Sequence, residues 1–524
     1  MKLFGSFTPL KHQAEDVAAL ELHPRVNIWN GLGTGKMHTG AWLAQRWWLR
    51  GVIDEVILVA PSMCFADWRA AFEGQAFPSE LVEFFDYRPP NQTSLVEAVS
   101  GARPPSGKLY VYGTSYGALR SIIGKHTNSR YTIKLDDPLL INLRGRRTAL
   151  LVDESQAIAL PSSQQSEAGS EIAAACRCVI SMTATPIGNP LQMRLWGMTR
   201  VVRPDVLAAA GVLDFIQFKV KYGVLIDPNQ RAGQPMVPAR AYPVSIQQAL
   251  VDADILLPMA PYTVRRTTEE CIDLPPIIRM RRTYKPDARV LRMMDELIEE
   301  DRTFLESGRA VLVENALTER LRTVELASGW IEDAIVHDGK VKLLVSTAKE
   351  IDETVSPSAQ RLVWASRTRE LLTCALVLSG ASADEAMQLG SDQSAYRDTV
   401  DRCRRANVGI IHGRTSDRDR DRIQADWRSG AIRDVCAHPG VAGAGLNWQH
   451  VKVMIYFSQP LGTIAREQSE ARVQRFGLKH RLMCFDLCME GGPDLAIAEA
   501  HAEQRSAARA ILDWMDSISR GMRA

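Results

Sequence analysis

A glycine-rich turn that ends in a lysine, residues 30–36, is the part of this sequence best suited to chemistry. Glycine lets backbone N–H groups approach phosphate oxygens closely, and the ammonium of Lys36 adds a positive point charge. The apolar residues 25–30 precede the turn, and residues 37–49, rich in Ala, Leu and Trp, follow it. A strand, a glycine loop and a helix in this order predict a nucleotide phosphate site, although a glycine turn by itself also occurs in ordinary tight connections.

Two adjacent carboxylates, Asp153 and Glu154, follow the apolar residues 149–152. A nucleotide hydrolase needs one carboxylate to hold hydrated Mg²⁺ and a second to orient or polarise the attacking water. An isolated pair of this kind also occurs as a solvated helix cap. The position of this pair, after a phosphate loop and a buried strand, favours the catalytic interpretation.

The groups just described need a scaffold, and short apolar segments that each end in a polar loop supply one. Nearly continuous apolar runs predict buried parallel strands, whose carboxyl ends share one edge of a sheet. The fold class predicted is therefore α/β, with two lobes of similar type. The expected strands are 25–30, 56–60, 109–112, 149–152 and 178–182 in the first lobe, and 361–365, 408–411, 434–438, 451–457 and 482–487 in the second.

The same pattern predicts four regions along the chain. Residues 1–203 form a first lobe with the nucleotide motifs, and residues 204–335 form an insertion and a largely helical linker, helical over 295–329. Residues 336–490 form the second lobe, and residues 491–524 form a C-terminal helix.

The composition is that of an ordinary globular enzyme, with 46% hydrophobic and 24% charged residues in a chain of 524. The apolar runs are too short to cross a bilayer, and the first nine residues lack a signal core, which predicts a cytoplasmic protein. Nine cysteines without a paired framework indicate reduced, buried thiols. Since 63 basic and 61 acidic residues nearly cancel, any nucleic-acid binding must come from local patches.

Some residues suggest a site but fit the core better. The indoles of Trp68, Trp427 and Trp448 are capable of stacking on bases, yet core packing is the favoured interpretation. Cys436 and the nearby histidines 438 and 450 lack a fourth metal ligand, so no metal beyond magnesium is predicted.

Several motifs, in order, resemble those of the superfamily 2 helicases. They are Gln13, the loop that ends at Lys36, residues 153–156, residues 183–186, residues 412–415 with Arg420, residues 443–447 and residues 468–477. Residues 182–190 with 195–196, and residues 264–267 with 274–275, are similar to the Swi/Snf-type ATPases, in a compact bacterial or viral form. The resemblance extends over about residues 8–490. It implies two RecA-like lobes that bind ATP between them and nucleic acid across both.

The resemblance assigns catalytic roles to five residues. Lys36 would contact the β and γ phosphates, Asp153 would hold Mg²⁺ through water, and Glu154 would act on the attacking water. Arg472 and Arg475 would stabilise charge in the transition state. Steps of three and four residues predict that Gln468 and these two arginines share one helical face.

The resemblance also implies binding and coupling roles. Gln13 would read the adenine edge, and further nucleotide contacts would come from Gly33, Thr34, Gly35, Gln156, Gly445 and Gln468. Nucleic acid would be held by Ser62, Thr114, Arg265, Arg266 and Asn447, and nucleotide state would be sensed by Thr183 and Thr185. Contacts to the sugar-phosphate backbone predict little sequence specificity.

One residue departs from the pattern: Met37 follows Lys36, where the motif normally has Thr or Ser as a direct magnesium ligand. A thioether is a poor ligand for a hard cation. Water, Thr34 or Thr39 would have to compensate. The hypothesis is that hydrolysis survives with weakened magnesium binding.

The predicted function is an ATP-dependent DNA translocase, a helicase-like motor that is stimulated by duplex DNA and located in a bacterial cytosol or a virus-infected host cell. Three alternatives remain open. They are a nucleotide-gated DNA-binding protein with weak or no hydrolysis, a helicase that acts on branched DNA, and an RNA helicase.

Overall fold

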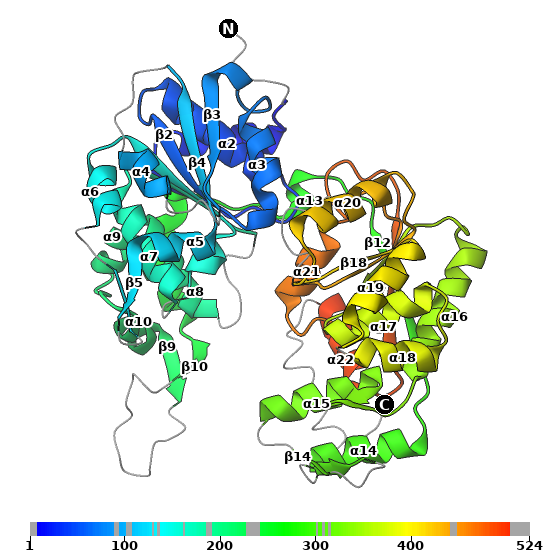
Figure 1. Ribbon diagram of the computed structural model, residues 1–524. Coiled ribbons are helices and arrows are strands. Elements are labelled where there is room, and N and C mark those ends of the chain that lie inside the picture. Colours follow the sequence, from blue (N-terminus) through cyan, green and yellow to red (C-terminus); the bar gives the residue numbers. More distant parts are fainter. Residues whose placement is uncertain are drawn as a thin grey trace, which may run out of the picture. The chain divides into compact units, whose positions relative to one another are not determined.

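The computed structural model describes residues 8–88, 94–100, 107–127, 130–133, 137–160, 163–184, 191–226, 242–299, 302–305, 310–312, 316–392, 394–440 and 448–503. The chain divides into two compact units, Met1–Asp273 and Leu274–Ala524. Each unit is built around its own sheet (Figure 1).

Seven parallel strands form the sheet of the first unit. The strands are rich in apolar residues because they are buried. All five residues of β2, for example, are buried: four are apolar, and the carboxylate of the fifth, Glu55, is paired with Arg146. The order across the sheet is β11 (Thr263–Val264), β1 (Arg25–Ile28), β8 (Cys178–Met182), β7 (Thr148–Asp153), β2 (Glu55–Val59), β4 (Leu109–Thr114) and β3 (Val82–Asp86).

Helices and two hairpins connect and flank these strands. The α-helices are α1 (Lys11–Leu20), α2 (Lys36–Leu49), α3 (Phe65–Phe72), α4 (Ser94–Ser100), α5 (Tyr116–Ile123), α6 (Pro138–Arg144), α7 (Gln164–Ala175), α8 (Leu191–Val202), α9 (Pro204–Ala209), α10 (Phe215–Tyr222), α11 (Gln248–Val251), α12 (Leu257–Met259) and α13 (Thr268–Cys271). Short turns of other helix types are η1 (Ser62–Cys64), η2 (Ser79–Leu81), η3 (Ser155–Ile158), η4 (Asp252–Leu256) and η5 (Ala260–Tyr262). The hairpins pair β5 (Gly124–Thr127) with β6 (Arg130–Ile133) and β9 (Gly223–Ile226) with β10 (Tyr242–Ile246).

Six parallel strands form the sheet of the second unit. The order is β12 (Ile277–Tyr284), β21 (Leu482–Met489), β20 (Val453–Tyr456), β17 (Arg361–Trp364), β19 (Asp434–Ala437) and β18 (Val408–Ile411). Its helices are α14 (Ala288–Glu299), α15 (Ala316–Ser328), α16 (Gly339–Thr354), α17 (Thr368–Leu378), α18 (Ala383–Ser391), α19 (Tyr396–Arg405), α20 (Asp417–Arg428), α21 (Thr463–Glu470) and α22 (Pro493–Ala502). Two hairpins complete it, β13 (Arg302–Phe304) with β14 (Ala310–Leu312) and β15 (Trp330–Ile331) with β16 (Ala334–Ile335).

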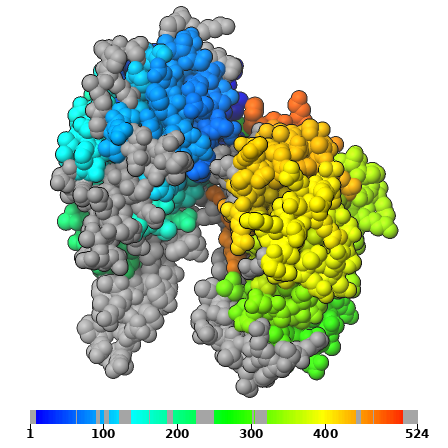
Figure 2. Space-filling model, viewed as in Figure 1, coloured from blue at the N-terminus to red at the C-terminus, as the bar shows by residue number. Residues whose placement is uncertain are grey.

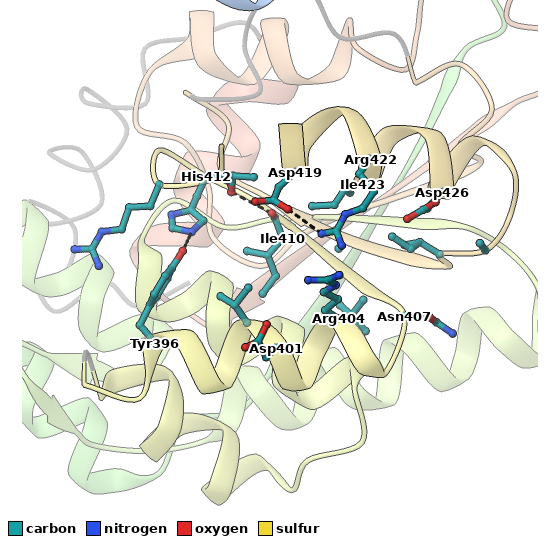
Figure 3. Close-up of a pocket in the computed structure, with 17 residues that line it drawn as sticks. Tyr396, Asp401, Arg404, Asn407, Ile410, His412, Asp419, Arg422, Ile423 and Asp426 are labelled. Carbon is teal, nitrogen blue, oxygen red and sulfur yellow. Dashed lines mark hydrogen bonds and ion pairs between the residues drawn. The ribbon is translucent and has the colours of Figure 1, made fainter. Parts of the chain in front are cut away.

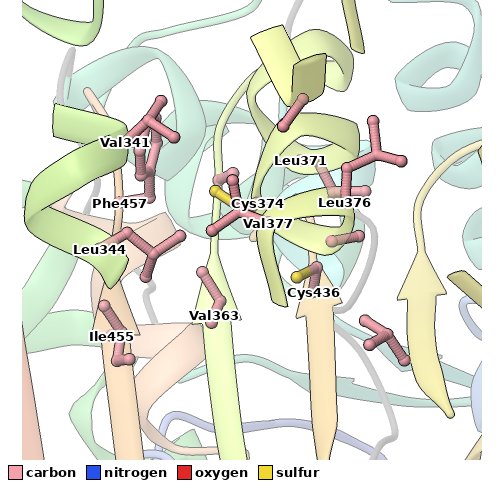
Figure 4. Close-up of a cluster of buried hydrophobic side chains, with 14 of the residues drawn as sticks. Val341, Leu344, Val363, Leu371, Cys374, Leu376, Val377, Cys436, Ile455 and Phe457 are labelled. Atoms are coloured by element: carbon pink, nitrogen blue, oxygen red, sulfur yellow. The ribbon is translucent and has the colours of Figure 1, made fainter. Parts of the chain in front are cut away.

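A continuous apolar core lies between the second sheet and its helices. Side chains of β17, β19 and β20 meet those of α16 and α17, among them Val363, Cys436 and Ile455 from the strands and Leu344 and Leu371 from the helices (Figure 4). All five are fully buried. Helices α18 and α19, drawn in yellow, and helix α20, drawn in amber, form part of the visible surface of this unit (Figure 2).

The predicted α/β class with two lobes of parallel strands is confirmed. All ten expected strands are present, with ends shifted by at most two residues. Trp68, Trp427 and Trp448 are fully buried, so the core interpretation of these indoles is confirmed as well.

One expected helix is interrupted. The sequence predicts helix over residues 295–329, whereas the structure contains α14, the hairpin of β13 and β14, and then α15. The β-branched Thr303 favours an extended backbone, and its hydroxyl donates a 2.5 Å hydrogen bond to Oε2 of Glu296 on α14. The hairpin therefore folds back onto the helix that precedes it.

The region 204–335 does not form a body of its own. Residues up to Asp273 belong to the first unit, where β11 adds to the sheet edge next to β1. Residues from Leu274 belong to the second unit, where β12 pairs along its whole length with β21. Among the described residues, no helix combines the length and apolarity needed to cross a membrane.

Candidate functional site

The glycine loop lies at the carboxyl end of β1 and leads directly into α2. Gly33 and Gly35 have φ angles of 75° and 79°, in the left-handed region that favours glycine. A Cβ at position 35 would also lie 2.5 Å from Nε2 of Gln13. The backbone path of the loop therefore requires glycine at these positions.

Lys36 lies across its own loop. Its Nζ donates hydrogen bonds of 2.9 Å to the carbonyl of Asn30 and 2.8 Å to that of Gly31. A phosphate oxygen carries a charge and is a stronger acceptor for an ammonium than these neutral carbonyls. The loop thus holds the ammonium of Lys36 at a position from which it can bind a phosphate.

Helix α1 supports the loop from one side. Nε2 of Gln13 donates to the carbonyl of Gly35 at 3.2 Å, and Nε2 of His12 lies 2.9 Å from the carbonyl of Thr34. Oε1 of Gln13 accepts a 2.8 Å hydrogen bond from the backbone N–H of Leu10. Gln13 is thus placed at the phosphate loop, as a nucleotide-contacting residue must be, and its predicted role toward adenine stays a prediction.

A buried carboxylate, Asp16, ties the loop to the segment after β11. Its oxygens accept from Nδ2 of Asn30 at 2.6 Å and from Nε of Arg266 at 2.8 Å, and Arg266 also contacts Glu15 at 3.0 Å. The carbonyl of Arg266 accepts from the N–H of Gly31. The sequence assigned Arg266 to nucleic acid, but in the structure its guanidinium braces the phosphate loop. Of the predicted pair, Arg265 is the exposed member.

Asp153 ends β7, the neighbour of β8 and β2 in the sheet, and is only 9% exposed. Burial raises the pKa of Asp153 to about 6, and the adjacent Glu154 charge adds to the rise, while a hydrogen bond from Trp68 and the charge of Lys36 oppose it. Lys36 follows β1 and Asp153 ends β7, with β8 between these parallel strands, so both residues lie at the carboxyl edge of the sheet. A carboxylate pair beside a phosphate loop is the donor set that hydrated Mg²⁺ prefers.

Glu154 adopts an unusual backbone conformation. Its φ of 55° lies in the left-handed region, which costs about 1–3 kcal/mol for a residue with a side chain and is typical of functional sites. Oε2 of Glu154 accepts a 2.7 Å hydrogen bond from Nε2 of Gln156.

Gln156 also contacts the predicted coupling motif. Its Oε1 accepts a 2.6 Å hydrogen bond from the hydroxyl of Thr183, at the end of β8. The three side chains of Thr183, Gln156 and Glu154 thus form a hydrogen-bonded relay between the two motifs. The coupling role of Thr183 stays a prediction. Thr185, the second coupling residue, lies outside the described residues.

The other two predicted nucleic-acid residues of the first unit differ in exposure. Ser62 is exposed at the start of η1, after β2. Thr114 is fully buried, and its hydroxyl donates to the carbonyl of Tyr87 at 3.4 Å. Thr114 therefore stabilises the end of β4 rather than presenting its hydroxyl to a ligand, because the neighbouring strand β3 and its following loop cover it.

In the second unit, helix α21 carries Gln468 but ends at Glu470. Arg472 and Arg475 therefore lie beyond the helix, and the expectation that all three share one helical face is wrong. The carbonyl of Arg472 accepts from the N–H of Trp448, so contacts to the chain after residue 447 fix this turn. Arg472 is largely buried and Arg475 is half-buried. Gly445 and Asn447 lie outside the described residues.

A cationic cavity of about 440 Å³ lies at the carboxyl ends of β17 and β19, where sequence reasoning had assigned no site. Arg367, Thr368 and Arg369 reach it from the start of α17, and Arg414 and His438 from the loops after β18 and β19. Asp333 and Asp392 also line it, so cations outnumber carboxylates only modestly. The polar residues 366–369 directly after a buried strand are the signal that would have revealed this cavity.

A groove of about 420 Å³ lies along β18, the edge strand (Figure 3). It is lined in part by His412, Arg414 and Thr415 of the segment 412–415, which resembles a helicase motif. Nε2 of His412 lies 2.6 Å from the hydroxyl of Tyr396, and Tyr396 and Arg414 line both spaces. The hydroxyl of Thr415 accepts from the N–H of His412 and donates to the carbonyl of Ile410, which closes the carboxyl end of the strand edge.

Comparison with known proteins gives one family match and several structural neighbours. Residues 383–477 match the family model of the helicase conserved C-terminal domain. No curated protein matches the chain. This match lies within the second unit and agrees there with the resemblance to superfamily 2 helicases.

Among solved structures, the SWI2/SNF2 ATPase core of Sulfolobus solfataricus in complex with double-stranded DNA is 16% identical, with a TM-score of 0.37 over 100% of this chain and 96% of its own. The DUF1998 helicase MrfA bound to DNA and AMPPNP is 11% identical, with a TM-score of 0.50 over 95% of this chain. The chain spans half the length of MrfA, and at this identity the likeness concerns the fold alone.

Proposed function

We propose that this protein is a Swi/Snf-type motor that hydrolyses ATP to move along duplex DNA. The single observation that carries the proposal is the placement of Lys36, Asp153 and the relay from Glu154 to Thr183 at one edge of a parallel sheet. The Swi/Snf assignment rests on the sequence motifs at residues 182–190 with 195–196 and at residues 264–267 with 274–275.

The residues of this edge fit ATP and Mg²⁺. The N–H groups of the loop before α2 and the Nζ of Lys36 would hold the phosphates. Asp153 would hold the metal ion through water, and the positive charge of the metal ion would offset the charge of the phosphates. Glu154 would accept a proton from the attacking water, with Gln156 fixing its orientation through the 2.7 Å hydrogen bond. Met37 adds no ligand for a hard cation, so the proposal includes weak magnesium binding.

Arg472 and Arg475 would stabilise the negative charge that develops on the γ-phosphate. Both arginines belong to the second unit, whereas Lys36 belongs to the first. Productive hydrolysis would therefore require the two units to close on the nucleotide, and reopening after hydrolysis would let the two DNA contacts advance alternately.

The DNA contacts would come from exposed polar and basic groups at the carboxyl edges of both sheets. Ser62 and Arg265 are exposed in the first unit, and Arg414 at the cavity beside α17 is exposed in the second. Arg367 and Arg369, which also line that cavity, are half-buried and form ion pairs with Glu325. Arginine and helix N-termini bind phosphate oxygens without reading bases, so low sequence specificity follows. MrfA, a neighbour in fold, is described as bound to DNA and AMPPNP.

A nucleotide-gated DNA-binding protein is the second candidate, and Met37 is the observation that favours it. Steady-state ATP hydrolysis with duplex DNA, single-stranded DNA, RNA or no polymer separates the candidates. The motor predicts hydrolysis that duplex DNA stimulates and that Lys36→Ala abolishes. Nucleotide binding without turnover on any polymer would establish the gated protein instead, and stimulation by RNA alone would identify an RNA helicase.

A further inference from the structure

Trp68 makes a contact that its burial in the core does not by itself require. Its indole Nε1–H donates a 2.9 Å hydrogen bond to Oδ2 of Asp153, and Trp68 is fully buried while Asp153 is 9% exposed. The hydroxyl of Tyr116 donates to the backbone carbonyl of the same aspartate. Two aromatic residues thus fix the side chain and the main chain of Asp153.

The order of the strands explains why these residues converge. β7, which ends at Asp153, lies beside β2, and β2 lies beside β4. Helix α3, with Trp68, follows β2, and helix α5, which begins at Tyr116, follows β4. All three segments therefore leave the sheet at the same edge.

The indole is held in place by its neighbours. Its ring stacks on Phe72 with centroids 5.8 Å apart, and Phe72 stacks on Phe77 at 5.8 Å. An indole N–H is a neutral group that only donates, so it orients a carboxylate without cancelling the negative charge that a cation needs. A lysine or arginine at this position would instead compete with the metal.

We propose that Trp68 is a positioning residue for metal binding: its N–H holds one oxygen of Asp153, so that the other oxygen serves the hydration shell of the nucleotide's Mg²⁺. This inference rests on the proposed function, in which Asp153 holds that metal. Groups that orient a metal-holding side chain contribute substantially to metal affinity.

The alternative role for Trp68 is purely structural, and the chain offers a matched control for it. Trp47 on α2 is 1% exposed, belongs to the same unit, and donates its Nε1–H to the backbone carbonyl of Glu21 at 3.0 Å. Trp→Phe at either position removes one buried indole hydrogen bond and a similar side-chain volume. Only Trp68→Phe removes a contact to Asp153.

The experiment uses the full chain and measures binding rather than turnover. A fluorescent, non-hydrolysable ATP analogue is titrated with Mg²⁺, and Mn²⁺ binding in the presence of the same analogue is followed by electron paramagnetic resonance. Trp68→Phe is expected to raise the half-saturating metal concentration about tenfold, while Trp47→Phe leaves it unchanged. Benzothienylalanine at position 68 keeps the shape of the indole and lacks its N–H donor, so it must produce the same shift even if phenylalanine disturbs the fold.

Two negative results have different meanings. If the wild-type protein binds the analogue with no metal dependence, the proposed function fails and this inference fails with it. If the wild type depends on the metal but both position-68 variants match it, or Trp47→Phe causes an equal shift, the positioning role alone is overturned.

Discussion

At the scale of single residues, burial makes the negative charge of Asp153 costly to the folded state. Its pKa is raised to about 6 in the folded protein, against an ordinary value of 3.8. The folded state therefore binds the proton more tightly than the unfolded state does, and the free energy of unfolding falls as the pH rises from about 4 to about 6. In the proposed function, Asp153 must carry this charge in order to hold the metal.

Asp153→Asn removes the charge and keeps an oxygen that can accept from Trp68. Above pH 6 we expect the free energy of unfolding of this variant to exceed that of the wild type by up to about 3 kcal/mol. The difference should shrink toward zero near pH 4. Urea unfolding at a series of pH values measures it. A difference between the two proteins that does not change with pH would show that the charge of Asp153 is not costly.

Met37 gives a second prediction for a single residue. Met37→Thr introduces the hydroxyl that related phosphate loops use as a direct magnesium ligand, so the magnesium concentration for half-maximal ATP hydrolysis should fall several-fold. Met37→Leu, which has no hydroxyl, is the matched control and should resemble the wild type. An unchanged rate together with an unchanged magnesium dependence in Met37→Thr would refute weakened magnesium binding.

At the scale of elements, a buried ionic cluster holds helix α21 to the second sheet. Arg466, 2% exposed, contacts Glu470 at 2.6 Å and Asp486 on β21 at 2.7 Å, and its guanidinium lies 3.5 Å from the ring centroid of Tyr456 on β20. Glu470 also receives two hydrogen bonds from Arg279 on β12. The helix that leads to Arg472 and Arg475 is thus fixed by charges at its own end.

Arg466→Met should destabilise the second unit by about 3–5 kcal/mol, because it leaves the buried carboxylate of Asp486 without its cation and removes one of the two cations that contact Glu470. Arg281→Met is the control: it breaks an ion pair to Glu499 whose side chains are 43% and 47% exposed, and should cost less than about 1 kcal/mol. Thermal or urea unfolding measures both. Equal effects of the two substitutions would mean that the cluster does not stabilise the helix.

The basic cavity beside α17 gives a prediction for DNA binding. Arg414→Gln removes an exposed guanidinium from the cavity, so affinity should fall by a similar factor for DNA duplexes of different sequence. The slope of log affinity against log salt should decrease in magnitude by about one. Arg418→Gln, an exposed arginine on α20 outside the cavity, is the control. A loss confined to one DNA sequence would contradict backbone recognition.

Sequence reasoning was most successful where local pattern and structure coincide. Buried parallel strands are continuous apolar runs, so β2 and β8 are recognisable in the sequence. The loop between β1 and α2 is also recognisable, because the φ angles of Gly33 and Gly35 favour glycine at those positions. The end of α21 at Glu470 depends on contacts to β21 and β12, which no local spacing of Arg472 and Arg475 reveals. The burial of Thr114 and the contact of Arg266 to Asp16 likewise arise from distant segments.

At the scale of the whole molecule, the chain consists of two units, each with its own parallel sheet. The sequence predicts the two lobes because each has its own series of apolar runs. It does not predict where residues 204–335 go, because β11 and β12 join the two sheets through pairing with strands far away in sequence. The proposed catalytic lysine and carboxylates lie in one unit and the proposed arginine fingers in the other, which is the distribution that the proposed motor requires.

The most direct test of the motor is displacement of a triplex-forming strand from duplex DNA. With ATP and Mg²⁺, the wild-type protein should release the third strand while the duplex itself stays paired, and Lys36→Ala should release none. Release that depends on ATP would establish movement along duplex DNA. Absence of release by a wild-type protein that binds both the nucleotide and the duplex would contradict the account and leave a nucleotide-gated DNA-binding protein.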